Sequence, residues 1–179
     1  MEFKKIKDIR EYVLDIYLNG AQIKCYAKYS PITAREGYYE GEVVKTKMKN
    51  GLDETENIVT LDKSINKLDN VVTNPSQEKY VVGKQKFDKK YQYAIKNLYF
   101  PKKVVQLFIK IDENISFTAP WGEEMNIEKG GYLNITDKND IYGVQEKEFK
   151  ETYAECDTNG KFLDESLNYD ETNIDDLQM

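Results

Sequence analysis

Apolar residues recur at helical spacing near the start of the chain and at strand spacing further along. Between residues 3 and 18 they stand three or four positions apart: Phe3, Ile6, Ile9, Val13 and Ile16. This spacing predicts a helix with one apolar stripe, ended by Asn19-Gly20. Alternate apolar residues then predict a strand over residues 21–29. The alternative is a hairpin that pairs residues 13–18 with that strand across Asn-Gly, and we expect the helix.

Alternation and β-branched residues dominate the remainder of the chain. Residues 42–48 and 54–61 have the pattern of a hairpin around a turn at 49–52. Further strands are predicted at residues 70–73, 79–82, 104–111, 115–118, 125–127, 132–135 and 141–144. Residues 84–91 and 145–153 are rich in charged helix formers, and each segment places a Phe and a Tyr four positions apart. Both segments are therefore predicted to be short helices.

One pattern occurs twice, ending at Tyr91 and again at Tyr153. Residues 69–91 align with residues 131–153 at a constant offset of 62, without gaps. The shared pattern is Y-x-V-x4-F-x3-Y, and it superposes Tyr80 on Tyr142, Val82 on Val144, Phe87 on Phe149, and Tyr91 on Tyr153. Residues two apart share a strand face and residues four apart share a helix face, so one core can receive all four. We interpret them as core residues, with an aromatic binding platform as the alternative.

These patterns together predict an α+β, mainly β, fold. We expect two similar small antiparallel sheet units, each closed by a short helix, with an N-terminal helix and an acidic C-terminal tail. The expected division is an N-terminal helix and strand, a first repeat unit, a second repeat unit and a flexible tail, at residues 1–41, 42–95, 100–154 and 155–179.

The second unit resembles a motif of small phage and prophage proteins. Its residues 128–133 read Glu-Lys-Gly-Gly-Tyr-Leu, followed by Ile-Tyr-Gly-Val at 141–144 and Glu-Phe-Lys-Glu-Thr-Tyr at 148–153. In the phage motif a Pro-Gly-Asp-Tyr turn leads into a strand, a hairpin and a closing Phe-x-x-Thr-Tyr helix. Gly130-Gly131 stands here in place of Pro-Gly-Asp, and residues 69–91 look like a sister version. The resemblance implies a phage-related accessory protein and brings no catalytic residue with it.

Charge is concentrated at the C-terminal end. The formal net charge is -6. Residues 155–179 hold eight carboxylates against the single Lys161, so the preceding residues are close to neutral. We interpret the segment as a solvated, partly disordered tail, and a polyanion that imitates nucleic acid is the alternative. The lysine-rich residues 84–90 coincide with a predicted helix whose outer face is solvated, so we do not expect nucleic-acid binding.

Composition removes several kinds of chemistry. The chain has no histidine, which excludes His-based general bases, His metal ligands and His-containing triads. Cys25 and Cys156 are far apart and suggest neither a disulfide framework nor a zinc site. Glycine-rich phosphate signatures are absent from the sequence, so we expect no catalytic residue, no metal and no cofactor. With no secretory signal and no apolar run of about 20 residues, we expect a cytoplasmic protein without a membrane partner.

Three loops are the candidate binding regions. The turn at 118–124 holds the only Trp, and Trp121 with Glu123 is either a turn packed on the sheet or an exposed anchor for a partner. The polar loop at 33–40 holds Arg35 and Tyr39. It is either a site for phosphate or carboxylate or an exposed loop in which Arg35 pairs with Glu36 or Glu40. Asn74 opens the third loop, the turn-rich lead of the first repeat unit.

The favoured function is binding rather than catalysis. We expect a phage- or prophage-derived accessory protein that engages a host macromolecule or a small ligand through the loops around Arg35, Asn74 and Trp121. One alternative is a small enzyme that uses Glu, Tyr or Lys on a nucleotide or another phosphorylated compound. Another is an inhibitor of a host defence or nucleic-acid-binding protein that acts through the acidic tail. The sequence assigns no oligomeric state.

Overall fold

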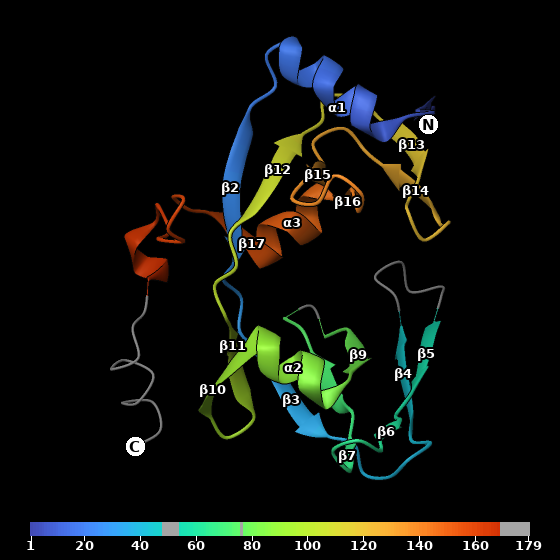
Figure 1. The fold of residues 1–179 in the computed structure, drawn as a ribbon, viewed down its shortest axis with the longest axis vertical. Helices are drawn as coiled ribbons and strands as arrows, with labels where there is room; N and C mark the ends of the chain where they lie inside the picture. The colour runs from blue at the N-terminus through green and yellow to red at the C-terminus, as the bar shows by residue number, and fades with distance from the viewer. Residues whose placement is uncertain (48–53, 76, 169–179) are drawn as a thin grey trace. The chain divides into compact units, whose positions relative to one another are not determined.

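The computed structural model describes residues 1–47, 54–75 and 77–168, and its fold is α+β and mainly β (Figure 1). The described residues divide into two compact units. Unit 1 contains residues 1–28 and 103–168, and unit 2 contains residues 29–102. Over the described residues, no helix has the length and apolar character needed to cross a membrane.

Unit 1 is built on a five-stranded antiparallel sheet in the order β16-β15-β12-β2-β17. Its strands are β2 (Ile23–Lys28), β12 (Gln106–Lys110), β15 (Tyr132–Asn134), β16 (Tyr142–Val144) and β17 (Tyr153–Glu155). A smaller three-stranded sheet joins β1 (Lys4–Lys5), β13 (Ile115–Thr118) and β14 (Glu124–Ile127). The unit also contains α1 (Ile9–Leu18), α3 (Glu146–Thr152) and the 3-10 turn η1 (Glu165–Leu167).

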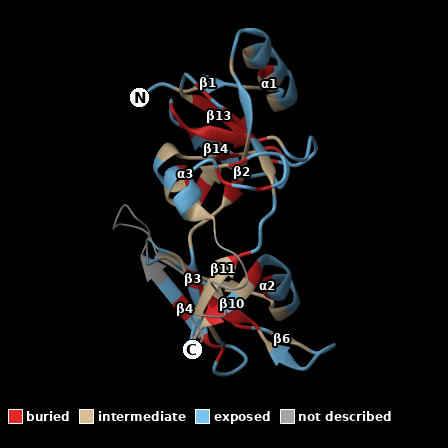
Figure 2. Cartoon of the chain, turned by 90° about the vertical axis from the view of Figure 1, so that its left-hand side faces the viewer, coloured by how far each residue is buried: buried red, intermediate tan, exposed pale blue. Residues whose placement is uncertain are grey.

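The two faces of the unit 1 sheet are covered by different elements. Successive strand residues point to opposite faces, so Phe108 and Ile109 of β12 enter different clusters. Phe108 packs with Phe149 of α3, and Ile109 packs with Tyr12 of α1 and with the β13–β14 hairpin. Each face of the sheet therefore contributes residues to a buried cluster, and Figure 2 shows buried residues in red.

Helix α1 starts later than its apolar pattern predicts. Asp8 is the N-cap, and its carboxylate accepts hydrogen bonds from the backbone amides of Arg10 and Glu11 at 3.1 and 3.2 Å. The preceding Lys4–Lys5 forms strand β1, which pairs in parallel with β13. The expected helical start at residue 3 is therefore wrong, because residues 4–5 are extended and the helix begins only at Ile9. The hairpin alternative for residues 13–18 is also wrong.

Unit 2 has a five-stranded antiparallel sheet in the order β10-β11-β3-β8-β9. Its strands are β3 (Ile32–Glu36), β8 (Asn70–Thr73), β9 (Lys79–Val82), β10 (Tyr91–Ile95) and β11 (Leu98–Pro101). Helix α2 (Lys84–Lys90) packs Phe87 against one face. Two hairpins complete the unit: β4 (Val43–Lys47) with β5 (Glu54–Ile58), and β6 (Leu61–Asp62) with β7 (Lys67–Leu68). The predicted turn at 49–52 lies outside the described residues.

The boundaries of the units differ from the expected ones. The chain passes between units at Tyr29 and at Lys103, not near residues 41 and 100. Strand β2 pairs with β12 and β17, whereas β3, which follows it directly, pairs with β8 and β11. These are long-range pairings, which local hydrophobic patterns do not specify.

The first part of the expected acidic tail is folded. Cys156 and Phe162 form a β-bridge, and the Phe162 side chain is only 1% exposed. The Asn168 amide accepts from the Phe162 backbone amide at 2.9 Å and donates to its carbonyl at 3.0 Å. Residues 155–168 thus belong to unit 1, and residues 169–179 lie outside the described residues.

Candidate functional site

The β13–β14 hairpin presents the loop that contains Trp121. The strands pair from Ile115 opposite Ile127 to Thr118 opposite Glu124. The turn is closed by the Ala119 amide, which donates to the Glu123 carbonyl at 2.7 Å. Gly122 has a φ of +94°, a conformation that side-chain-bearing residues rarely adopt, so glycine fits this turn.

The Trp121 indole is exposed and held in place. The residue is 56% exposed, and its indole N–H donates to Glu123 Oε2 at 2.8 Å. Its ring centroid lies 6.3 Å from that of Tyr142, whose hydroxyl accepts a hydrogen bond from Asn134 Nδ2 at 2.8 Å. The structure therefore brings Trp121 and Glu123 together and leaves a large aromatic face open to solvent.

Arg35 lies on a strand rather than in a loop. Its guanidinium donates to Glu42 Oε2 at 2.6 Å and to Glu42 Oε1 at 3.3 Å. Arg35 also lies 4.0 Å from the ring centroid of Tyr38, whose backbone amide donates to Glu42 Oε1 at 2.7 Å. The prediction of a loop at 33–40 is wrong for residues 33–36, and so is the expected pairing with Glu36 or Glu40.

The Arg35–Glu42 pair stabilises unit 2. Glu42 is buried, and the hydrogen bonds from Arg35 and from the Tyr38 amide lower the pKa of its carboxyl. A buried carboxylate requires such partners, because desolvation of an unpaired charge is costly. Tyr39 is exposed. We therefore assign Arg35 a structural role.

Asn74 closes the turn between β8 and β9. Its side-chain oxygen accepts from the Glu78 amide at 2.9 Å, and its backbone amide donates to the Glu78 carbonyl at 3.0 Å. An Asn side chain that bonds to the backbone a few residues on is a common turn device. Asn74 and Arg35 belong to unit 2, whereas Trp121 and Glu123 belong to unit 1.

An open groove in unit 1 was not predicted. It has a volume of about 780 Å³ and is lined by the end of α1, the start of β2, the end of β12 and Tyr132. Its aromatic and cationic members are Tyr12, Tyr26, Tyr132, Lys24 and Lys110. Tyr12, Lys24 and Tyr26 lie at least 84 positions before Lys110 and Tyr132 in the sequence, so no local sequence signal could have identified the groove.

The tyrosines of this groove are neutral hydrogen-bonding groups. The Tyr12 hydroxyl donates to Glu113 Oε1 at 3.2 Å, and burial, reinforced by Glu113, raises the pKa of Tyr12. Burial raises the pKa of Tyr26 to about 12, and its hydroxyl is hydrogen-bonded to that of Tyr132. Burial also raises the pKa of Tyr132.

The two lysines of the groove have acidic neighbours. Lys24 Nζ lies 3.3 Å from Glu155 Oε1, and Lys110 Nζ lies 3.9 Å from Glu146 Oε2. Both pairs are partly exposed, so water screens them. The groove thus combines cations, neutral hydroxyls and aromatic rings with the carboxylates of Asp112 and Glu113. Among residues 1–47, 54–75 and 77–168, no group of three or more His, Cys, Asp or Glu is arranged to hold a metal ion.

Comparison with known proteins adds no family to this description. No protein-family model, no curated protein and no solved structure matches the chain. The resemblance of residues 128–153 to phage proteins stays a prediction.

Proposed function

We propose that the protein is a non-catalytic accessory protein of phage or prophage origin that binds a host protein, with Trp121 as the central contact. The observation that carries this proposal is the indole at the hairpin tip, which is exposed yet fixed by its bond to Glu123. The resemblance of the second repeat unit to phage proteins supports the origin.

An exposed Trp held in one conformation suits protein binding. Trp residues are enriched among the few interface positions that dominate binding energy. Fixing a side chain before association lowers the entropy lost on binding. Glu123 accepts the indole N–H, so burial of the ring under a partner leaves that donor satisfied. The hairpin therefore offers apolar contact area without an unpaired indole N–H.

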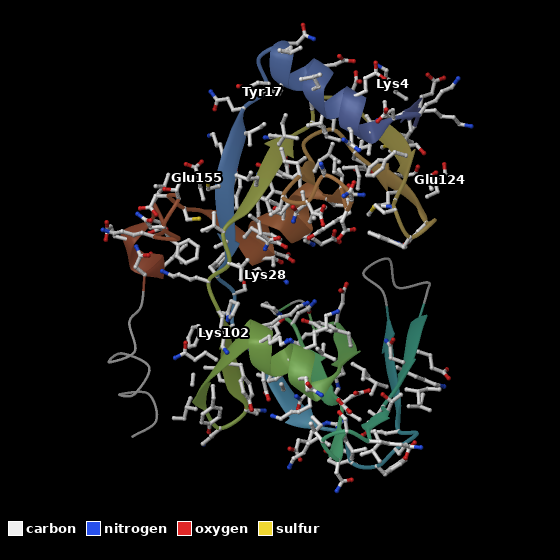
Figure 3. All side chains as sticks on the ribbon, viewed as in Figure 1. Lys4, Tyr17, Lys28, Lys102, Glu124 and Glu155 are labelled. Carbon is white, nitrogen blue, oxygen red and sulfur yellow. The ribbon has the colours of Figure 1, made fainter. Side chains whose placement is uncertain are left out.

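A pull-down from host lysate tests this proposal. We expect Trp121→Ala to abolish capture of the partner, and Glu123→Gln to weaken it by roughly tenfold or less, because the amide oxygen still accepts the indole N–H. Tyr17→Ala is the matched control, since Tyr17 is an exposed aromatic on α1 of the same unit (Figure 3). Equal capture by the wild type and Trp121→Ala would refute the role of the hairpin.

The groove supports a second candidate, binding of a small anionic aromatic ligand. Its lysines suit a phosphate, and its tyrosines suit a planar ring. We would titrate the protein with adenosine monophosphate by calorimetry and compare Lys24→Ala with Lys161→Ala, which removes an exposed lysine of unit 1 that neither lines the groove nor pairs with a residue that lines it. Binding that is lost only in Lys24→Ala supports this candidate, and an absence of heat at millimolar ligand rejects it for this probe.

A further inference from the structure

The five-stranded sheets of the two units have the same register in their β8–β9 and β15–β16 ladders. Val72 lies opposite Tyr80 in unit 2, and Asn134 lies opposite Tyr142 in unit 1. The offset between the two ladders is 62, the same as in the sequence repeat. In both units the hairpin then leads into a short helix and a strand at the opposite edge of the sheet.

The match extends to a strand outside the sequence repeat. Tyr99 of β11 lies opposite Ile32 of β3, and Tyr26 of β2 lies opposite Gln106 of β12. Each of these tyrosines meets the helix phenylalanine edge-on: Tyr99 with Phe87 at 4.9 Å and 81°, and Tyr26 with Phe149 at 4.8 Å and 78°. Strands β11 and β2 therefore occupy the same place in their sheets.

Each of these two strands is followed in the sequence by a strand of the other unit. Strand β2 completes unit 1, yet it leads through residues 29–31 into β3 of unit 2. Strand β11 completes unit 2, yet it leads through residues 102–105 into β12 of unit 1. Lys28 and Lys102, labelled in Figure 3, stand just before the two crossings. Both connections have the length of ordinary hairpin loops.

The chain can be divided into two contiguous segments, 23–95 and 98–155, which begin with β2 and β11. Each segment forms most of one sheet, but its first strand lies in the sheet of the other segment. We propose that the chain consists of two copies of one unit with exchanged first strands, and that the same exchange joins two chains, β2 of one chain completing unit 1 of another. The partner in this interaction is a second copy of the chain. Exchange of identical elements between protomers requires no new interface.

The interior of unit 1 selects β2 over β11. Ala27 of β2 is fully buried, opposite Ala154 of β17. The residue at the corresponding place in β11 is Phe100, opposite Gln92 of β10. A phenylalanine ring does not fit a closed alanine site without displacing its neighbours. If β2 leaves the sheet of unit 1, its place is therefore taken by a β2 strand, either from the same chain or from another chain.

The native cysteines report which β2 strand fills unit 1. Cys25 of β2 and Cys156 stand on neighbouring antiparallel segments, and the Cys156 amide donates to the Cys25 carbonyl at 3.0 Å. Both are free thiols. Opposed residues of antiparallel strands have Cα atoms about 5.5 Å apart when hydrogen-bonded, a separation that permits a disulfide. Diamide would take up the two electrons and two protons that the thiols release.

The experiment compares refolded with untreated protein. The full chain is unfolded in urea, refolded at two concentrations that differ tenfold, and oxidised with diamide. We expect a disulfide-linked dimer whose share rises about tenfold with concentration while dimers are rare, and only an intrachain Cys25–Cys156 disulfide in the untreated monomer. Mass spectrometry identifies the linked peptides.

Cys25→Ser is the matched control. It should form the same dimer by size-exclusion chromatography without the covalent link, which separates strand exchange from accidental oxidation. Refolded wild type that remains monomeric at both concentrations, with only intrachain disulfide, overturns exchange between chains. Dimers linked other than through Cys25 and Cys156 overturn it as well.

Discussion

Phe149 of unit 1 and Phe87 of unit 2 each contact two tyrosines at corresponding places. Ring centroids of Tyr153 and Tyr26 lie 5.3 and 4.8 Å from Phe149, and those of Tyr91 and Tyr99 lie 5.0 and 4.9 Å from Phe87. The Phe and the closing Tyr of the sequence repeat are thus buried core residues in both units, and Tyr80, Val82 and Val144 pack against these cores. Tyr142 differs, because it is half-buried beside Trp121. In each unit the Phe and the closing Tyr hold a short helix on the sheet.

Corresponding positions in the two five-stranded sheets can also hold residues of different chemical character. Ile109 of β12 lies opposite Leu133, and Arg35 of β3 lies opposite Val71, 62 positions before Leu133. Ile109 is fully buried among apolar residues, whereas Arg35 binds Glu42. An arginine can therefore take the place of an apolar residue in a sheet and have a structural role. A search for binding sites by sequence pattern would wrongly select such an arginine.

Removing either central phenylalanine should have the largest effect. Phe149→Ala and Phe87→Ala each delete a buried ring and should lower the free energy of unfolding by about 3–5 kcal/mol. Urea unfolding checks both, with circular dichroism for the whole chain and fluorescence of Trp121, the only tryptophan, for unit 1. A loss below about 1 kcal/mol in one variant alone would show that the two surroundings are not energetically equivalent.

Copying a residue from one sheet into the other should have the next largest effect. Gly143 stands 62 positions after Val81, and a Cβ at Gly143 would collide with the side chain of Ile127. Gly143→Val should therefore destabilise unit 1 by about 1–3 kcal/mol. Val81→Ile is the control in unit 2. A neutral Gly143→Val, measured by urea unfolding, would show that unit 1 tolerates the packing of unit 2.

Loss of the Arg35 guanidinium should destabilise unit 2 less. Arg35→Ala leaves Glu42 without its main partner and should cost about 1–2 kcal/mol, because the pair is partly exposed. The folded-state pKa of Glu42 is lowered, so its contribution is present above the unfolded value near 4.5 and is lost as pH falls through the folded value. Urea unfolding at pH 7 and pH 4 should show a smaller acid sensitivity in Arg35→Ala than in the wild type. An unchanged acid sensitivity would contradict this assignment.

Trp121→Ala should change stability least. The indole is mostly exposed and its bond to Glu123 is on the surface, so we expect a change within about 0.5 kcal/mol. Thermal unfolding followed by circular dichroism measures it. A decrease in the free energy of unfolding of more than about 2 kcal/mol would mean that the indole stabilises the fold. Such a result would contradict a role of Trp121 in binding alone.

Local patterns predict the fold where local contacts decide it. The strand at 70–73 is confirmed to the residue, and the helix at 84–91 within one residue, because alternation and i to i+4 pairs are short-range. The predicted loop containing Arg35 fails, because Glu42 pairs with the arginine and makes a polar strand stable in the sheet. The sequence also does not predict which unit contains β2, because its partners β12 and β17 lie far away in the sequence.

The candidate site is predictable in part. The lone Trp between Pro120 and Gly122 predicts the turn that holds Trp121 and Glu123, because turn chemistry is local. The groove of Tyr12, Tyr26 and Lys110 depends on α1, β2 and β12 meeting in space, which spacing along the chain does not encode.

Crosslinking from position 121 tests whether the β13–β14 hairpin contacts a host protein. A photoreactive phenylalanine analogue replaces Trp121 in one protein and Tyr17 in another, and both are irradiated in host lysate. We expect one dominant crosslinked host protein from position 121 that is absent from position 17. The same set of crosslinks from both positions would contradict this expectation.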